Sequence, residues 1–185
     1  MPEKIPVEFI EDFLVVWDFQ SGSELYRKGY YGKPLGIAKP KVPEFHVPLI
    51  LDLMEGLYLA EKGTIKVYEG SEKERVSLTK LRQMAKQLYE EFDDKYSVYH
   101  DLRDKGLVVT PGIKFGCDFA VYKQGPGVEH APYMVSVKKA KSTMTAMDIV
   151  KAGRLATTVR KRFIIAVPDS EKENVKYLIF KWFKA

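Results

Sequence analysis

The feature that most constrains the fold is a change in the hydrophobic pattern near residue 107. Beyond it, five short apolar segments have the pattern of β-strands, and one amphipathic helix interrupts them after the third. Thr145 and Asp148 form the capping pair at which we expect that helix to begin. A helix that connects two strands in this way predicts a mixed sheet. The five segments are Leu107–Thr110, Phe115–Tyr122, Tyr133–Lys139, Phe163–Pro168 and Tyr177–Phe183, and the expected core face of the helix consists of Ile149, Ala152, Ala156 and Val159.

The first 88 residues have a different texture, which is typical of a smaller α+β domain. Gly and Pro punctuate residues 5–45, and this predicts short strands and turns. A helical pattern opens at Pro48 and closes at Gly63, a strand follows over Thr64–Tyr68, and Ser77 is expected to cap a second helix. The predicted fold class is therefore an α+β N-terminal domain over residues 1–88, followed by an α/β nuclease-like C-terminal domain with a mixed central sheet over residues 89–185.

The composition excludes several classes of protein. No apolar run approaches the roughly 18 residues that span a bilayer, and the first residues carry acids and prolines rather than a basic and then apolar signal. The single cysteine, Cys117, excludes an internal disulfide and a four-cysteine zinc site, and its apolar neighbours indicate a small core residue. We therefore expect a soluble, cytoplasmic protein with no membrane partner.

Charge is unevenly distributed along the chain. Residues 1–100 carry 14 basic and 17 acidic side chains, whereas residues 101–185 carry 16 basic and 8 acidic ones. Lysine and arginine gain affinity for a polyanion by releasing counterions from its phosphates. The second half is therefore the expected binding surface for a nucleic acid, although lysine-rich surfaces also occur for reasons of thermal stability.

The sequence carries no recognisable metal or nucleotide site. The three histidines, His46, His100 and His130, lie far apart, and no Asp/Glu pair has the context of a two-metal centre. The sequence Gly125-Pro126-Gly127 lacks the Gly-Lys-Ser/Thr that would complete a phosphate-binding loop. We expect neither a metal nor another cofactor.

What remains is a set of side chains suited to acid–base chemistry. His130 lies in a loop, Tyr122 ends a strand-like segment, and Lys161 belongs to a basic run between the helix and the following strand. Arg154 precedes Lys161 by two helical turns and so shares its face of the helix. Taken one at a time, each of these positions also suits an ordinary surface or sheet residue.

Together these residues match a known family. The segment from Gly112 to Tyr122, GIKFGCDFAVY, resembles the KFG-x-DF-x-x-Y signature of archaeal tRNA-splicing endonucleases. Gly125-Pro126-Gly127 and the segment from His130 to Tyr133 continue the pattern, with Ala131 where a serine is common, and the spacing from His130 to Lys161 also matches. Upstream, Leu51–Gly63 is similar to the helix of the family's N-terminal domain.

The resemblance implies a catalytic triad of Tyr122, His130 and Lys161. It also implies metal-free cleavage of precursor tRNA at the bulge–helix–bulge of exon–intron junctions, leaving 2′,3′-cyclic phosphate and 5′-hydroxyl ends. Attack by a 2′-hydroxyl needs a base, an acid for the leaving 5′-oxygen and a cation for the phosphorane charge. His130 would be the acid and Lys161 the cation, while Tyr122 would either act as the base or orient the 2′-hydroxyl.

The resemblance further suggests residues that bind RNA. Family members hold a bulge nucleotide between two cationic or aromatic side chains, and Arg154 matches the first of them. Trp182 is the candidate for the second, because an unstacked base can lie on an indole, but a core position for Trp182 is equally compatible. The segment Tyr30–Lys41 is similar to a lysine-bearing loop of crenarchaeal-type members and would be an extended arm that presents Lys33, Lys39 and Lys41.

The chain shows no tandem duplication, so two active sites require several copies. A heterotetramer with a non-catalytic structural subunit is favoured, and a homotetramer is the alternative. The acidic turn Asp169–Glu173 would insert into a basic pocket of a neighbour, and the strand Tyr177–Phe183 would pair with another chain. Two other functions stay open: a non-catalytic RNA-binding subunit and a metal-dependent DNA nuclease.

Overall fold

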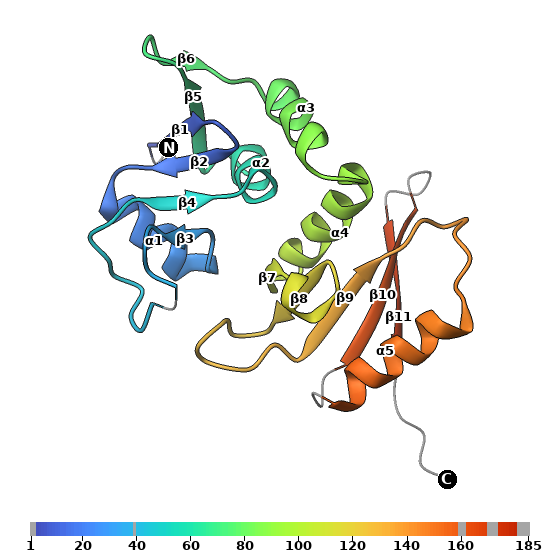
Figure 1. Cartoon of the computed structure of the whole chain (residues 1–185). Coiled ribbons are helices and arrows are strands. Elements are labelled where there is room, and N and C mark those ends of the chain that lie inside the picture. Colours follow the sequence, from blue (N-terminus) through green and yellow to red (C-terminus); the bar gives the residue numbers. More distant parts are fainter. Residues whose placement is uncertain (1–2, 39, 159–161, 170–173, 181–185) are drawn as a thin grey trace. The chain divides into compact units, whose positions relative to one another are not determined.

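The computed structural model describes residues 3–38, 40–158, 162–169 and 174–180 (Figure 1). The chain divides into two compact units, Met1–Phe92 and Asp93–Ala185. This division falls at the start of α4 (Phe92–Asp104), slightly beyond the boundary that we placed at residue 88. Within the described residues, no helix is both long and apolar enough to cross a membrane.

The N-terminal unit is a sheet covered by helices. Its strand order is β3-β4-β2-β1-β5-β6, in which β1 and β5 run parallel and the other neighbours antiparallel. Helix α2 comes so close to β2 that a Cβ atom added at Gly56 would lie 1.8 Å from Cδ1 of Leu14. The elements are β1 (Ile5–Ile10), β2 (Phe13–Val16), α1 (Phe19–Gly29), β3 (Lys33–Pro34), β4 (Leu49–Leu51), α2 (Leu53–Glu61), β5 (Ile65–Glu69), β6 (Glu74–Arg75) and α3 (Leu78–Leu88).

Helix α1 corrects the prediction of only strands and turns over residues 5–45. Asp18 caps this helix by accepting a hydrogen bond from the Ser21 N–H at 2.8 Å, and Leu25 and Tyr26 are buried. Gly22 lies within α1 and not in a turn. A Cβ atom added at this position would lie only 3.1 Å from Cβ of Leu49. The glycine that suggested a turn instead permits close packing between the helix and β4.

The next helix begins later than Pro48, where its start was predicted. Leu49–Leu51 form β4, and Asp52 caps α2 in a reciprocal capping box with Glu55. The predicted cap of α3 is confirmed, because Oγ of Ser77 accepts a hydrogen bond from the Lys80 N–H at 3.2 Å.

The C-terminal unit is the predicted mixed sheet. Its strand order is β11-β10-β9-β8-β7, with β9 and β10 parallel and all other neighbours antiparallel. Helix α5 makes the crossover between β9 and β10, as predicted (Figure 1). The elements are α4 (Phe92–Asp104), β7 (Val108–Pro111), the 3-10 turn η1 (Ile113–Phe115), β8 (Phe119–Tyr122), β9 (Tyr133–Val137), α5 (Ala146–Thr158), β10 (Arg162–Asp169) and β11 (Asn174–Phe180).

The start of α5 is confirmed, but its predicted core face is not. The Thr145 N–H donates to Asp148 and the Asp148 N–H donates to Thr145 Oγ1, which completes the expected capping pair. Ile149, however, is 49% exposed, so it does not belong to the core of this unit. Val159 and the side chains of Ala152 and Ala156 lie outside the described residues.

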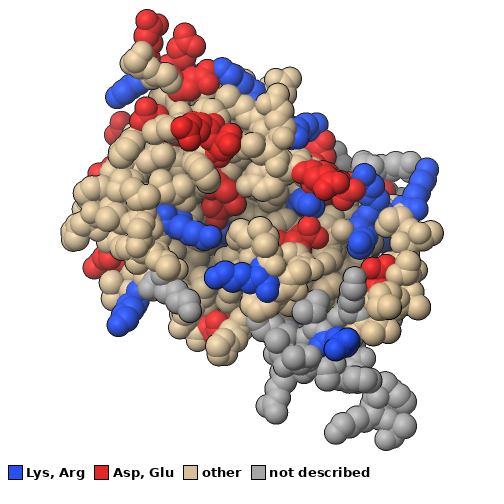
Figure 2. Space-filling view, viewed as in Figure 1, with Lys and Arg blue, Asp and Glu red and all other residues tan. Residues whose placement is uncertain are grey.

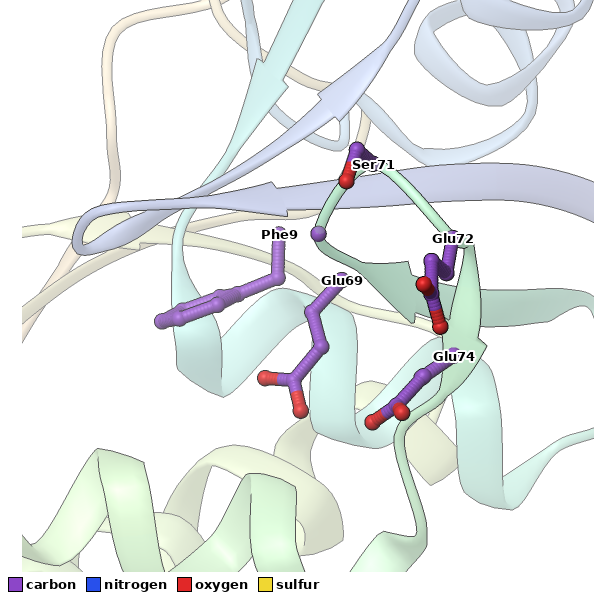
Figure 3. Close-up of a pocket in the computed structure, with 6 residues that line it drawn as sticks. Phe9, Glu69, Ser71, Glu72 and Glu74 are labelled. Carbon is purple, nitrogen blue, oxygen red and sulfur yellow. The ribbon is translucent and has the colours of Figure 1, made fainter.

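Acidic side chains gather over the β5–β6 hairpin on the face shown in Figure 2. Glu69 and Glu74 are directly opposite each other across the two strands, an arrangement that like charges disfavour. Together with Glu72 and Phe9 they line a hollow of about 470 Å³ (Figure 3), and Lys80 forms an ion pair with Glu69. Because three carboxylates surround this hollow, it is poorly suited to a phosphate ligand.

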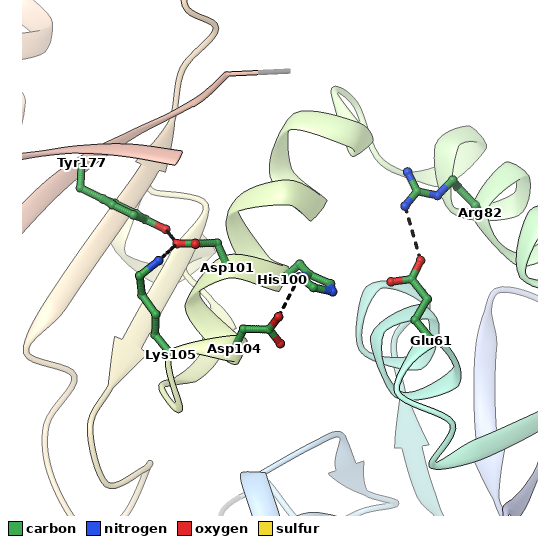
Figure 4. A network of polar contacts seen from close by, with 7 residues as sticks. All are labelled: Glu61, Arg82, His100, Asp101, Asp104, Lys105 and Tyr177. Carbon is green, nitrogen blue, oxygen red and sulfur yellow. Dashed lines mark hydrogen bonds and ion pairs between the residues drawn. The ribbon is translucent and has the colours of Figure 1, made fainter. Parts of the chain in front are cut away.

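A polar network joins α4 to the edge strand β11. A carboxylate oxygen of Asp101 accepts hydrogen bonds from the Tyr177 hydroxyl and from Nζ of Lys105 (Figure 4). Burial, the hydrogen bond to Asp101 and the charge of that carboxylate all raise the pKa of Tyr177. The phenol therefore stays protonated, and holds β11 to α4, across the neutral range.

We expect Gly56→Ala to destabilise the N-terminal unit by about 1–3 kcal/mol, because the added methyl group overlaps Leu14. Denaturant unfolding would measure the loss. Gly153→Ala is the matched control, since a Cβ at this helical glycine meets nothing within 4 Å and alanine favours a helix. Equal stabilities of the Gly56→Ala variant and the unmodified protein would contradict the close packing.

We expect the Tyr177 network to make stability depend on alkaline pH. Because folding raises the pKa of this phenol, its contribution is complete below the unfolded tyrosine pKa of about 10 and is lost as the pH rises further. In Tyr177→Phe, unfolding curves should show about 1–2 kcal/mol less stability at neutral pH and a smaller alkaline loss than in the unmodified protein. Asp101→Asn should also reduce the alkaline loss; an unchanged alkaline branch in both variants would rule the network out.

Candidate active site

The signature segment before β8 is a tightly packed turn. A Cβ atom added at Gly112 would lie 2.6 Å from Sγ of Cys117, and Gly116 has a positive φ of 67° that favours glycine. Cys117 is buried, as its apolar context predicted, although it lies before β8 and not within it. Close packing against Cys117 therefore requires a glycine at position 112, and the left-handed backbone favours one at position 116.

Asp118 fixes the point at which β8 begins. Its Oδ2 accepts a hydrogen bond from the Val137 N–H of β9 at 2.8 Å, and its Oδ1 lies 3.3 Å from Nζ of Lys95 on α4. The Asp118 N–H donates to the Val135 carbonyl at 3.1 Å. A single carboxylate thus ties β8 to β9 and to α4, which sets the position of every later residue of β8.

Tyr122 is the last residue of β8, where it pairs with Val108 of β7. It is half-buried and packs against an apolar cluster that includes Ala131, Met134 and Phe163. The predicted position of Tyr122 at the end of a strand is confirmed. Its position at the strand end is compatible with a hydroxyl that faces a substrate.

His130 is exposed in the loop that leads into β9. The next residue, Ala131, is 3% exposed and belongs to the same apolar cluster that Tyr122 contacts. A larger hydroxyl-bearing residue at position 131 is common in the family that the signature resembles, and here the buried position is filled by a methyl group. His130 is therefore a surface side chain whose following residue is anchored in the core.

Lys161 lies outside the described residues, but the start of the strand that follows it is well defined. The Arg162 N–H donates to the Pro132 carbonyl at 2.9 Å, and Arg162 pairs with Tyr133 at the start of β9. The Arg162 guanidinium carbon lies 5.9 Å from the centre of the Tyr133 ring. Arg162, which directly follows Lys161, is thus hydrogen-bonded to Pro132, which lies two residues after His130.

The topology brings these positions to one end of three neighbouring strands. Strands β8 and β9 are antiparallel, so the end of β8 at Tyr122 lies beside the start of β9, which His130 precedes. Strands β9 and β10 are parallel, so the start of β10 at Arg162 lies at the same end. Sequence reasoning identified the three residue types but did not derive this arrangement.

The candidate RNA-binding residues are placed only in part. Arg154 is exposed on α5, while Trp182 and Lys39 lie outside the described residues. Lys33 and Lys41 are exposed in the N-terminal unit. None of these positions contradicts a contact with RNA.

The segment Tyr30–Lys41 is not the free arm that we expected. Lys33 and Pro34 form β3, which pairs with β4 at the edge of the sheet, and the Leu35 N–H donates to the Pro48 carbonyl at 2.9 Å. The Gly32 N–H donates to Oε1 of the buried Glu55 at 3.0 Å. Backbone pairing therefore fixes the first half of this segment to the sheet and sets the position of Lys33.

In the part of the chain that the structure describes, no three His, Cys, Asp or Glu side chains come together as a metal site would require. Two of the hollows in the described part of the chain lie in the N-terminal unit, and neither of them is lined by Tyr122 or His130. His130 is exposed and Tyr122 is half-buried, so both side chains at this sheet end are accessible from outside the unit.

Comparison with known proteins agrees with the signature. Residues 5–82 match the model of the tRNA intron endonuclease N-terminal domain, and residues 92–177 match that of the tRNA intron endonuclease catalytic C-terminal domain. A tRNA-splicing endonuclease of Hyperthermus butylicus is 47% identical over 170 residues, covering 92% of this chain and 93% of that protein. One from Sulfurisphaera tokodaii is 40% identical over 178 residues, covering 96% and 98%. The chain therefore belongs to the tRNA intron endonuclease family and carries both its N-terminal and its catalytic C-terminal domain.

Proposed function

We propose that this endonuclease cuts precursor tRNA within the bulge–helix–bulge of exon–intron junctions, without a metal ion. The reaction would leave a 2′,3′-cyclic phosphate and a 5′-hydroxyl. The observation that carries the proposal is the gathering of Tyr122, the exposed His130 and the start of β10, which Lys161 precedes, at one end of adjacent strands. Acid–base side chains at one strand end of a unit rich in basic residues suit attack of a 2′-hydroxyl on an RNA phosphate.

His130 is the proposed general acid. It is exposed, so it can reach the leaving 5′-oxygen of a bound RNA, and imidazole exchanges protons near neutral pH. Lys161 would stabilise charge on the non-bridging oxygens. Tyr122, at the end of β8, would take the proton of the 2′-hydroxyl or hold that group in line for attack.

Binding of the RNA is proposed to use cations from both units. Arg154 on α5 and Trp182 would hold a bulge base between them, and Lys33, Lys39 and Lys41 would contact the phosphate backbone. The exposure of Arg154, Lys33 and Lys41 supports these roles.

The assembly that we propose is a heterotetramer with a non-catalytic structural subunit, with a homotetramer as the alternative. Strand β11 is an edge of its sheet, and Leu178 and Ile179 on it are 54% and 49% exposed. Exposed apolar residues on an unpaired edge favour pairing with another chain. Of the acidic turn Asp169–Glu173, which would enter a neighbour's pocket, the structure describes Asp169 alone. Oδ2 of Asp169 lies 3.7 Å from Nζ of Lys176.

The proposal predicts cleavage in excess EDTA that depends on His130. An end-labelled RNA with a bulge–helix–bulge should be cut in both bulges with cyclic-phosphate ends, and His130→Ala should lower the rate by about 10²–10⁴. His46→Ala, which removes an exposed histidine of the N-terminal unit, is the matched control and should cut normally.

Three results of that experiment would contradict the proposal, and a fourth would identify the assembly. Cleavage that EDTA abolishes would favour a metal-dependent nuclease. Full activity of His130→Ala would remove its role as the acid. Activity that appears only when a candidate structural subunit is added would establish an obligate heteromer, and silence even then would favour a non-catalytic RNA-binding role.

A second prediction concerns Lys33. If it contacts a phosphate, Lys33→Ala should weaken RNA binding and lower the slope of log K against log salt by about 1. Lys66→Ala is the matched control, because Lys66 is also an exposed strand lysine of the N-terminal unit, and its slope should stay unchanged. Filter binding at several salt concentrations measures both, and equal slopes for the two variants would remove Lys33 from the RNA-binding surface.

A further inference from the structure

The loop between Tyr122 and His130 is closed by one carboxylate. Oε1 of Glu129 accepts hydrogen bonds from the backbone N–H groups of Lys123 at 2.5 Å and of Gln124 at 2.6 Å. Lys123 directly follows Tyr122, and Glu129 directly precedes His130. A single oxygen atom thus connects the backbone next to one candidate catalytic residue with the side chain next to the other.

The rest of the loop is shaped to bring Glu129 back to these amides. The Gly125 carbonyl accepts hydrogen bonds from the Val128 N–H at 3.3 Å and from the Glu129 N–H at 3.2 Å. Gly125 and Gly127 have φ angles of 130° and 91°, which side-chain-bearing residues rarely adopt. The turn therefore depends on these two glycines, and its result is that Glu129 faces the end of β8.

His130 is consequently held on both sides. Before it, Glu129 is bonded across the loop, and after it, Ala131 is buried in the apolar cluster that Tyr122 also contacts. Acid–base transfer needs its groups held to well under an ångström, and an error of about 1 Å can cost about 100-fold in rate. An exposed loop histidine without such anchors would be free to move away from the strand end.

The negative charge of Glu129 has two opposite effects at this position. A carboxylate beside a site for a phosphate repels the RNA, and the residues from 101 onward carry only 8 acidic side chains against 16 basic ones. At this position the negative charge opposes substrate binding but strengthens two hydrogen bonds to backbone amides. The two effects act on different steps, so they can be separated by measurement.

We infer that Glu129 is a positioning residue of the endonuclease site: through the Lys123 and Gln124 amides it holds His130 in place relative to Tyr122. This inference rests on the proposed function. Glu129 touches neither the scissile phosphate nor the transferred protons, and acts only through the backbone of the loop. Its removal should therefore slow the chemical step without weakening RNA binding.

Single-turnover cleavage of a bulge–helix–bulge RNA by Glu129→Ala and Glu129→Gln, with any required partner subunit present, tests the inference. Glu129→Ala should cleave about 10–100-fold more slowly at saturation, with an RNA Kd that is unchanged or tighter. Glu129→Gln keeps an oxygen acceptor and should recover most of the rate. In the amide NMR spectrum, the Lys123 and Gln124 resonances should shift in Glu129→Ala and stay near their original positions in Glu129→Gln.

The controls separate this role from general stability. Glu72→Ala removes an exposed glutamate of the N-terminal unit and should leave rate, Kd and melting temperature unchanged. If Glu129→Ala does not fold, Glu129→Asp, which is too short to reach both amides, should show an intermediate rate in a folded protein. An unimpaired rate in Glu129→Ala, or an equal loss in Glu129→Gln, would overturn the positioning role alone. Failure of the unmodified protein to cut the RNA would overturn the proposed function and this role with it.

Discussion

The position of β8 in the C-terminal unit depends on the contacts that the carboxylate of Asp118 makes. It accepts a hydrogen bond from the backbone of β9 and pairs with Lys95 on α4, so the start of β8, an inner strand of the sheet, is held from two directions. The absence of a side chain at Gly112 allows the turn before β8 to pack closely against Cys117. Since β8 is only a few residues long, the position of Asp118 sets the position of Tyr122 at its far end. Gly112, Cys117 and Asp118 of the signature thus serve mainly to position β8.

The direction of strand pairing then assembles the site. An antiparallel pair followed by a parallel pair puts the end of β8 and the starts of β9 and β10 together, and α5 supplies the crossover that the parallel pair needs. The loop bonds of Glu129 and the buried Ala131 confine His130 to this end of the sheet. In the proposed active site, the rate would therefore depend on these backbone anchors as well as on the proposed acid and base.

The N-terminal unit uses a buried acid for a similar purpose. Glu55 completes the capping box of α2 with Asp52 and also accepts a hydrogen bond from the Gly32 N–H, so a segment with lysines is bound to the sheet rather than left free. A Cβ at Gly32 would lie 2.6 Å from the Ile50 carbonyl, which explains why a glycine is needed at this contact. The position from which Lys33 could reach RNA is therefore set by the interior of the unit.

The sequence by itself determined the family and the mixed sheet with its crossover helix, because motifs and hydrophobic periods are local properties of the chain. It also predicted Tyr122, His130 and Arg154 as residues of the site. It misjudged α1, the start of α2 and the burial of Ile149 on α5, and it overlooked Glu129, whose partners are backbone amides that no side-chain pattern reveals. The roles of all the candidate site residues stay predictions, and Lys161 and Trp182 also lie outside the described residues. Only the tertiary structure decided that Gly22 packs against β4 within a helix, that Lys33 belongs to an edge strand, and that three strand ends meet. Pairing direction and close packing are interactions between distant segments, and local sequence does not encode them.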